Sequence, residues 1–521
     1  MKSSKLLSEM DHAPRPSALP SLPITAISLL IAILGLVLRL DASRDDLWVD
    51  ELHTAWVVDG AWTELPSRAG IGNQPPLYFA IVKVVIGILG LSEISLRAVS
   101  LLAGCGLILT SWCFTWRVTT SHTSALIAVA FVALDTTCIF YASEARAYAL
   151  LQFVLAWYAI LVMKSDDQGF SSVLRAALAA LSVHLQFTSL LFLLPIYLTR
   201  LIYAAVSAST ARSRNFFSLG IEVGIVFVLC IPLSTQVLEI AGRGQAWSTF
   251  VPSPSIIGLW KMFPWTPAII SFAALLVRSE DREPTLRPVL GWLSWMNASS
   301  LLFGAFVALL GIAPLFFRRY LLGAEWPLLM LPGLVLSWSR RSLRYFLAIV
   351  VLGSIVWESK LIAPELWRHG RLAHFRSEAW SEAIDSIRGI DPQGDLPLFV
   401  ASGFIESRQL TENSSELLRE YCRLPIATLY RTPHSLSKIE PISSVIPRSP
   451  PQSWVEEIIT SSGGIWLVRV PLSGSEGWRN FGDRLLQTLK DRTGSEKWRI
   501  NVHLLAGITI LEIRLMRDSA P

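Results

Sequence analysis

The chain of 521 residues is apolar and weakly charged: 52% of its residues are hydrophobic, 16% are charged, and its mean hydropathy is +0.48. Soluble domains carry about a quarter charged residues, so this composition argues against one and, with repeated apolar runs near 20 residues long, predicts a polytopic membrane protein. The net charge of +5 is scattered over short loops and forms no basic stripe, so we expect no nucleic-acid partner.

The first apolar run, residues 24–38, predicts a membrane span that follows a short tail at residues 1–23. It is long for a signal-peptide core and lacks a small-residue cleavage site, which indicates an uncleaved anchor. With Lys2, Lys5 and Arg15 on the inside, the later inner loops hold the excess of Lys and Arg that the positive-inside rule requires. We therefore expect a multi-pass protein of the inner (cytoplasmic) membrane with a cytoplasmic N-terminus.

The next apolar stretch, "QPPLYFAIVKVVIGILG" (74–90), is short and interrupted by Lys83. A span needs about 20 apolar residues, so we interpret 76–90 as a helix lying in the interface; a short tilted span is the alternative. If 76–90 crossed the bilayer, every later loop would change sides, and the excess of Lys and Arg would fall in the outer loops. Ten further spans, eleven in all, are predicted at residues 95–116, 123–141, 147–163, 173–187, 188–206, 216–238, 263–278, 288–312, 320–338 and 345–358.

The character of the sequence changes near residue 360, where mixed polar and apolar residues with Pro and Gly replace the long apolar runs. Period-2 and amphipathic patterns predict strands at 396–402, 464–470, 498–505 and 508–515, and helices at 377–390 and 476–490. The predicted fold is an α-helical polytopic membrane protein with a small extracytoplasmic α/β domain. The transmembrane domain covers 24–360, with its first outer loop at 39–94, and the α/β domain covers 361–521.

Four polar clusters fall at the predicted outer face. Ionisable groups in or beside spans cost roughly 2.5–3.5 kcal/mol each on insertion scales, so by default they indicate function. The clusters are "WVDE" (48–51), "NQPPLY" (73–78), "YASEARAY" (141–148) and "FFRRYLLGAEWP" (316–327).

In the first cluster, Asp50 and Glu51 are the candidate catalytic residues. They could simply begin an amphipathic interfacial helix, since acids favour a helix N-terminus. A carboxylate held near low-dielectric surroundings can also serve as a general base, and we favour that role for Asp50. Glu51 points about 100° away on a helix, so we expect it to support or orient. Asp45 and Asp46 are interpreted as capping or solvated charges.

The other clusters offer candidates for substrate binding. Gln74 presents a neutral amide before a proline pair that fixes the backbone. Glu144 and Tyr148 share a helical face, with Arg146 on another; the alternative is an internal Glu–Arg pair at a span end.

The fourth cluster offers Arg318, Arg319 and Tyr320. The arginines could be snorkelling cations. Their outer position opposes the positive-inside trend, however, and arginine suits bidentate phosphate binding. We therefore expect them to bind an anion.

The order of these motifs resembles the GT-C superfamily of membrane glycosyltransferases. The similarity is greatest to bacterial relatives of protein O-mannosyltransferases and aminoarabinose-to-lipid-A transferases. These enzymes show a Trp-x-Asp-Glu type motif, a (His/Lys)-Pro-Pro-Leu stretch and a Tyr-(Ser)-x-Glu-Ala-Arg-x-Tyr segment. The resemblance covers residues 24–163 well and the Arg-Arg-Tyr region acceptably, whereas 173–312 is similar only in being hydrophobic.

The resemblance implies a polyprenyl-phosphate sugar donor in the membrane lipid and a glycan, lipid or protein acceptor. Asp50 matches the catalytic aspartate of the first loop, which would deprotonate the acceptor hydroxyl for attack on the anomeric carbon with inversion, through an oxocarbenium-like state. The leaving lipid phosphate needs cationic stabilisation, which Arg318 or Arg319 could supply together with Arg146.

At two positions the resemblance does not settle the role of the residue. Gln74 stands where the family usually has His or Lys, which removes a charge from the expected phosphate site. Glu144 matches an acid that orients the acceptor or binds a divalent ion; because metal dependence varies in the superfamily, the cofactor is left open. The competing hypotheses are a transporter or flippase of lipid-linked glycans, and a scaffold whose α/β domain binds a cell-surface partner.

Overall fold

The computed structural model describes residues 22–164, 169–206, 209–242, 265–276, 286–313, 315–337, 370–376, 378–404, 406–411, 413–427, 429–469 and 475–516, with single residues at 255, 257, 258, 349 and 353. The chain forms two compact units. Unit 1 comprises Met1–Ser43, Ala69–Val82 and Arg97–His374, and unit 2 comprises Arg44–Arg68, Lys83–Leu96 and Phe375–Pro521. Two segments of the first predicted outer loop therefore belong to the same unit as the C-terminal sheet.

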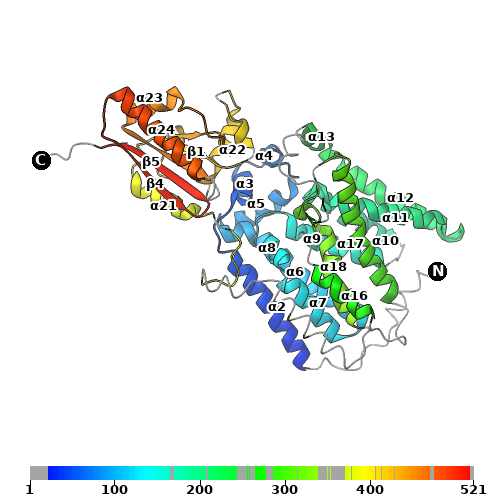
Figure 1. The fold of residues 1–521 in the computed structure, drawn as a ribbon. Helices are drawn as coiled ribbons and strands as arrows, with labels where there is room; N and C mark the ends of the chain where they lie inside the picture. The colour runs from blue at the N-terminus through cyan, green and yellow to red at the C-terminus, as the bar shows by residue number, and fades with distance from the viewer. Residues whose placement is uncertain are drawn as a thin grey trace. The chain divides into compact units, whose positions relative to one another are not determined.

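Up to residue 337 the described chain is helical (Figure 1). The helices are α2 (Leu22–Ala42), α3 (Val49–Asp59), α4 (Leu65–Ile71), α5 (Leu77–Leu89), α6 (Glu93–Thr119), α7 (His122–Leu134), α8 (Thr136–Ala142), α9 (Tyr148–Met163), α10 (Gly169–Leu185), α11 (Leu190–Val206), α12 (Ser209–Cys230), α13 (Ser234–Gly242), α16 (Trp265–Leu276), α17 (Leu286–Leu309) and α18 (Glu325–Leu336).

Five helical segments among the described residues are long and apolar enough to cross a membrane, and a sixth is added if the bent pair α7–α8 is one span. The five are Pro23–Ala42, Glu93–Thr119, Phe187–Val206, Ser213–Glu239 and Leu286–Leu309. The protein is thus a multi-pass membrane protein. Large apolar side chains of α2 and α12, such as Leu30 and Phe227, are exposed, as expected of helices that face lipid.

Several helices at predicted spans have fewer than the about 20 residues that a span needs. Helices α9 and α10 have 16 and 17 residues, and α18 has 12. Helix α5 has 13 residues, about 20 Å at 1.5 Å per residue, which is less than the roughly 30 Å hydrocarbon core. The predicted span at 345–358 lies almost wholly outside the described residues.

The predicted span at 123–141 is two helices, because the chain bends by 58° between α7 and α8. Asp135 sits at the break and caps α8: its Oδ1 accepts the Cys138 N–H at 2.8 Å. Buried Arg39 of α2 donates to the carbonyls of Val132 and Ala133, both at 2.9 Å, which satisfies the end of α7. The break is therefore stabilised by two charged side chains within an apolar region.

Small residues let the helices of unit 1 approach closely. A Cβ on Gly333 of α18 would lie 2.6 Å from the backbone oxygen of Ser124 in α7. A Cβ on Gly35 of α2 would lie 2.7 Å from that of Ala133, also in α7. Helix α7 is therefore packed between two neighbours whose backbones come near, as small-residue interfaces in membranes permit.

Unit 2 contains a five-stranded sheet in the order β2-β1-β3-β5-β4, in which β1 pairs in parallel with β2 and β3, and β5 pairs antiparallel with β3 and β4. The strands are β1 (Leu398–Ala401), β2 (Ile439–Pro441), β3 (Gly463–Arg469), β4 (Trp498–Leu505) and β5 (Ile508–Leu515). The four predicted strands correspond to β1, β3, β4 and β5. Strand β2 was missed because its three residues, ending in Pro, carry no period-2 signal.

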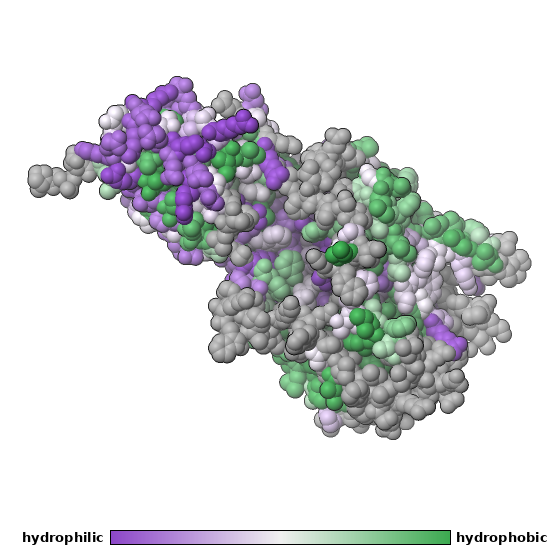
Figure 2. Space-filling model, in the orientation of Figure 1, coloured by the Kyte–Doolittle hydropathy of each residue, from purple (hydrophilic) through white to green (hydrophobic). Residues whose placement is uncertain are grey.

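The main core of unit 2 lies between the sheet and helices α23 (Gln452–Ser461) and α24 (Ser475–Thr493). Helix α24 buries Trp478, Phe481 and Leu485 against Trp466 of β3 and Leu511 of β5. Helix α21 (Trp380–Ile390) lies across the other face (Figure 1), and α22 (Glu416–Ala427) packs against α3. Figure 2 shows hydrophilic residues gathered over unit 2, whereas hydrophobic residues cover α11 and α12.

Candidate active site

Helix α3 carries the candidate base Asp50 in its first turn, after Trp48 as N-cap. From Val49 to Val58 every residue of the helix is buried except Asp50, which is half-buried. The apolar residues that alternate with the acids in the sequence thus fill the interior of unit 2. Asp50 is the acid of this first turn that reaches the surface of the unit.

Glu51 is fully buried and serves the structure of the same turn. Its Oε2 accepts the Trp48 N–H at 3.3 Å, the reciprocal half of a capping box. The same oxygen lies 3.3 Å from Nε of Arg376, whose side chain is also buried. This arrangement suits the supporting role expected for Glu51, and the role of Asp50 stays a prediction.

Asp45 holds the segment that precedes α21, and Asp46 holds the first turn of α21. Asp45 is buried and its Oδ2 accepts the backbone N–H groups of Phe375 and Arg376, at 3.1 and 3.2 Å. Asp46 accepts from the backbone N–H and hydroxyl of Ser381, at 2.7 and 2.9 Å. Asp45 and Asp46 were expected to cap or to be solvated; they instead fasten a segment more than 300 residues away.

Within unit 1, the second and third clusters are joined through one hydroxyl. The Ser100 hydroxyl donates to the backbone oxygen of Arg146 at 2.9 Å, so the Tyr78 hydroxyl, 3.0 Å away, donates to Ser100. Gln74 is buried, and its backbone oxygen accepts from Nε2 of Gln236 at 2.6 Å. Ser100 was not singled out from sequence, because a serine inside an apolar run carries no distinguishing signal.

The third cluster forms the turn between α8 and α9. Glu144, Arg146 and Tyr148 are all buried there, and the Arg146 N–H donates to the Glu144 carbonyl at 2.8 Å. The rings of Tyr141 and Tyr148 meet edge to face, with centroids 5.0 Å apart, and both pack on Leu322. The third cluster thus contacts the fourth.

The fourth cluster comprises two short 3₁₀ turns, Arg318–Tyr320 and Leu322–Ala324, that lead into α18. Nη2 of Arg318 lies 3.0 Å from Oε1 of Glu325, which is fully buried at the start of α18. The guanidinium of Arg319 lies over the rings of Phe317 and Tyr320, 4.9 and 5.8 Å from their centroids. Arg318 is therefore engaged by a carboxylate, whereas Arg319 is held on aromatic faces. Glu325 was present in the quoted motif but was not assigned a role.

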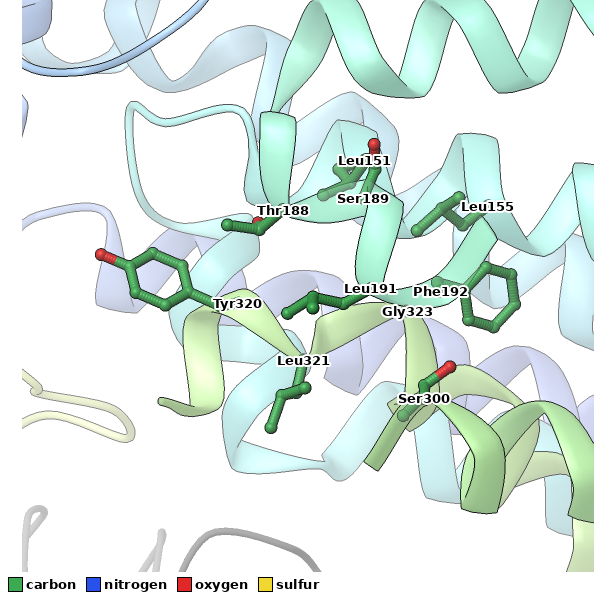
Figure 3. Close-up of a pocket in the computed structure, with 11 residues that line it drawn as sticks. Leu151, Leu155, Thr188, Ser189, Leu191, Phe192, Ser300, Tyr320, Leu321 and Gly323 are labelled. Atoms are coloured by element: carbon green, nitrogen blue, oxygen red, sulfur yellow. The ribbon is translucent and has the colours of Figure 1, made fainter. Parts of the chain in front are cut away.

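A small cavity beside this segment is shown in Figure 3. Its volume of about 10 Å³ suits a single water and cannot hold a sugar. Tyr320 is at its edge, and the phenol oxygen points away from the other labelled residues (Figure 3).

Unit 1 therefore brings three of the four clusters together, and unit 2 holds the first. Among the residues that the structure describes, no group of three or more His, Cys, Asp or Glu side chains is arranged to hold a metal ion.

Comparison with known proteins gives one kind of match. No protein-family model matches the chain, and no curated protein is significantly similar to it in sequence. The chain resembles ArnT. Two solved structures of ArnT from Cupriavidus metallidurans, one bound to undecaprenyl phosphate and one in the apo state, each align with a TM-score of 0.49 and 12% identity. The first alignment covers 96% of this chain and 99% of ArnT, and the second covers 94% and 97%.

Proposed function

We propose that this protein is a GT-C-type inverting glycosyltransferase that moves a sugar from a polyprenyl-phosphate donor to an acceptor hydroxyl. The observation that carries the proposal is the first turn of α3, where Asp50 is half-buried while the rest of the turn is buried and Glu51 is used by Arg376. Unit 1 adds a cluster rich in Arg and Tyr around the turn at 318–324.

In the proposed reaction, Asp50 accepts the proton of the acceptor hydroxyl as its oxygen attacks the anomeric carbon. The bond between that carbon and the phosphate oxygen breaks, and its electron pair leaves with the lipid phosphate. Arg318 or Arg319, together with Arg146, is the candidate to balance this charge. Glu144 and Tyr148, in the turn that packs on Leu322, are candidates to orient the substrates.

The lipid chain of the donor has a candidate binding surface in unit 1. Helices α11, α12 and α17 enclose an apolar groove of about 980 Å³, with Leu198, Phe216 and Leu302 among its lining residues. The segment that carries the arginines packs on α11 and α17. The same two helices therefore support both the proposed phosphate site and the groove, as a lipid with an anionic head requires.

We place the reaction on the outer side of the inner (cytoplasmic) membrane, with the N-terminus inside and the C-terminal α/β domain outside. This follows the charge bias of the predicted loops. The acceptor is proposed to be a glycan, a lipid or a protein of the cell envelope. Its class is left to experiment.

A transporter or flippase of lipid-linked glycans would need acids deep within spans, and Glu222 in the middle of α12 is such an acid. Both of its oxygens lie 2.8 Å from Nη1 of Arg200, and Oε2 lies 3.0 Å from Nε of Arg175. An acid held by two arginines suits a cross-link of α10, α11 and α12 better than a carrier site. Glu222 therefore does not favour transport.

The central test is Asp50→Asn in the full-length protein, with undecaprenyl-phosphate-linked hexoses and pentoses supplied singly and cell-envelope extract as acceptor. General-base catalysis contributes about 10²–10⁴-fold, so we expect transfer to fall at least about 100-fold while donor binding is retained. Asp59→Asn, an exposed acid at the end of the same helix, is the matched control and should transfer normally. Normal transfer by Asp50→Asn would refute the site.

The acceptor is identified by mass spectrometry of cell-envelope glycans from cells with and without the protein. We expect one linkage to be missing without it and to return with the unaltered chain. The Asp50→Asn chain should not restore that linkage. Restoration by the variant would contradict the assigned role of Asp50.

A further inference from the structure

The first turn of α3 is tied to the C-terminal sheet through one carboxylate, that of Glu378. Its Oε2 accepts the backbone N–H of Val49 at 3.1 Å and the indole N–H of Trp380 at 3.0 Å. Its Oε1 accepts from Nε and Nη2 of Arg469, at 3.0 and 2.7 Å. Arg469 is the last residue of β3, so a strand end, a buried acid and a helix start form one continuous chain of bonds.

Glu378 and Arg469 are both held in place by the residues around them. The Glu378 side chain is 7% exposed, and burial raises its carboxyl pKa, although the Arg469 guanidinium opposes this rise. Gly403 leaves the space that Arg469 occupies: its φ is +77°, and a Cβ there would lie 2.6 Å from Cδ of Arg469. The arginine therefore runs past a residue that must be glycine for two reasons.

The position of the Glu378 carboxylate has a direct consequence for α3. The first N–H groups of a helix have no partner within the helix, and an anion beside them is favourable. Glu378 supplies both the acceptor and the charge at Val49, one residue before Asp50. Loss of the carboxylate would free the turn that carries Asp50 without removing any group of the proposed reaction.

We propose that Glu378 and Arg469 are positioning residues, which fix the first turn of α3 and thereby the orientation of Asp50. The α/β domain thus takes part in catalysis through the geometry of α3. This inference rests on the proposed role of Asp50 as general base.

The test compares Glu378→Gln with Glu440→Gln in the full-length protein. Glu440 forms a two-bond pair with Nη2 of Arg419, at 2.7 and 2.8 Å, in the same unit, and has no hydrogen bond to the first turn of α3 among those found in the described residues. We expect Glu378→Gln to lower kcat about 10- to 100-fold with little change in KM, because a small misplacement of a catalytic group has effects of this size. Glu440→Gln should leave both constants near those of the unaltered protein.

Two readouts separate positioning from a general loss of stability. Hydrogen exchange of a peptide covering residues 47–53 should be faster in Glu378→Gln than in Glu440→Gln, because the Val49 N–H loses its charged acceptor. The acidic limb of the kcat/KM profile should move to lower pH, because removal of a nearby negative charge favours the ionised form of Asp50. The charges of Glu51, Arg376 and Arg469 are unchanged in this variant.

The double variant Glu378→Arg/Arg469→Glu gives a further discrimination. It keeps an ion pair within the domain but presents a cation, which cannot accept, to the Val49 N–H. We expect its kcat to stay low. Recovery of kcat in the swapped protein would show that the ion pair is sufficient without an acceptor for the Val49 N–H. That result would overturn the proposed positioning role. Should the swapped chain not fold, Glu378→Gln and its exchange data decide alone.

The outcomes distinguish this inference from the proposed function. If Asp50→Asn transfers normally, the base assignment fails and this inference fails with it. If Asp50→Asn is inactive but Glu378→Gln matches Glu440→Gln in kcat and exchange, only the positioning role is overturned. If Glu378→Gln lowers kcat and has no further effect when added to Asp50→Asn, both hold, because the residue then acts through Asp50.

Discussion

The acids of the first outer loop have the same charge but different tasks at the scale of single residues. Asp41 and Asp45 accept backbone N–H groups from the segment that precedes α21, and Asp46 accepts one from the first turn of α21. Glu51 pairs with Arg376 and caps its own helix. Asp50 is half-buried between the buried residues Val49 and Glu51. The interleaving of acids and apolar residues therefore reflects anchoring for most of them and, in our proposal, chemistry for one.

The role of Glu51 is tested by Glu51→Gln, which removes the charge that balances buried Arg376. Breaking a buried ion pair by removing one partner costs about 3–5 kcal/mol. We expect a clearly lower midpoint of thermal unfolding in detergent, with transfer reduced only in proportion to the folded fraction.

The control for Glu51→Gln is Glu64→Gln, which removes a half-exposed partner of Arg68. Exposed ion pairs contribute about 0–1 kcal/mol to stability, so the midpoint of thermal unfolding of this variant should be close to that of the unaltered protein. A Glu51→Gln protein of normal stability that no longer transfers sugar would instead make Glu51 a catalytic residue.

Sequence alone could select Asp50 and Glu51 but could not assign their roles. The candidate pair follows from local pattern, because acids between Trp48 and Leu52 at the end of a span are unusual. What separates the two side chains is Arg376, more than 300 positions away, and no local pattern reports such a partner. For the same reason, the sequence pattern could not predict the partners of Glu378.

At the scale of elements, the apolar runs predicted where helices lie but not where they break. The run at 123–141 contains Asp135, whose role as N-cap of α8 depends on Arg39 satisfying the end of α7 from another helix. An Asp followed by Thr136 and Thr137 inside an apolar run is a signal that could have indicated the break. Long strands were likewise predicted, whereas three-residue β2 depends on β1 for its pairing.

The close crossing of α7 and α18 is tested by Gly333→Ala. The new Cβ would lie 2.6 Å from a backbone oxygen, so the helices must separate. Overpacking of this kind costs about 1–3 kcal/mol, and we expect a lower unfolding midpoint.

Gly291→Ala in α17 is the matched control, because a Cβ there meets nothing within 4 Å. Alanine is the better helix former by about 1 kcal/mol, so this variant should be at least as stable as the unaltered protein. Equal stability of the two variants would show that the crossing tolerates a methyl group.

At the scale of the whole molecule, composition predicted a multi-pass membrane protein with a C-terminal α/β domain, and the described helices and sheet agree with that class. The predicted number of eleven spans is not confirmed: five or six helical segments of sufficient length are found among the described residues. Hydropathy reports apolar length, and it does not report where a polar cap or a turn divides that length into shorter helices.

The proposed topology is tested with reporter fusions. Alkaline phosphatase joined after residue 521 should be active, because it folds only outside the cytoplasm, and the same reporter joined after Lys164 should be inactive. The positive-inside bias is the physical reason for this expectation. Green fluorescent protein at the same two positions should give the opposite pattern. Activity after Lys164 and none after residue 521 would invert the topology.

The bonds between the first loop and the segment before α21 also set an order of events during biogenesis. Asp45 and Asp46 leave the ribosome about 330 residues before Phe375 and Ser381, to which they bind. The loop must therefore wait through the insertion of nearly all the membrane helices before its anchors exist. A chain that stops before residue 371 therefore cannot form these bonds.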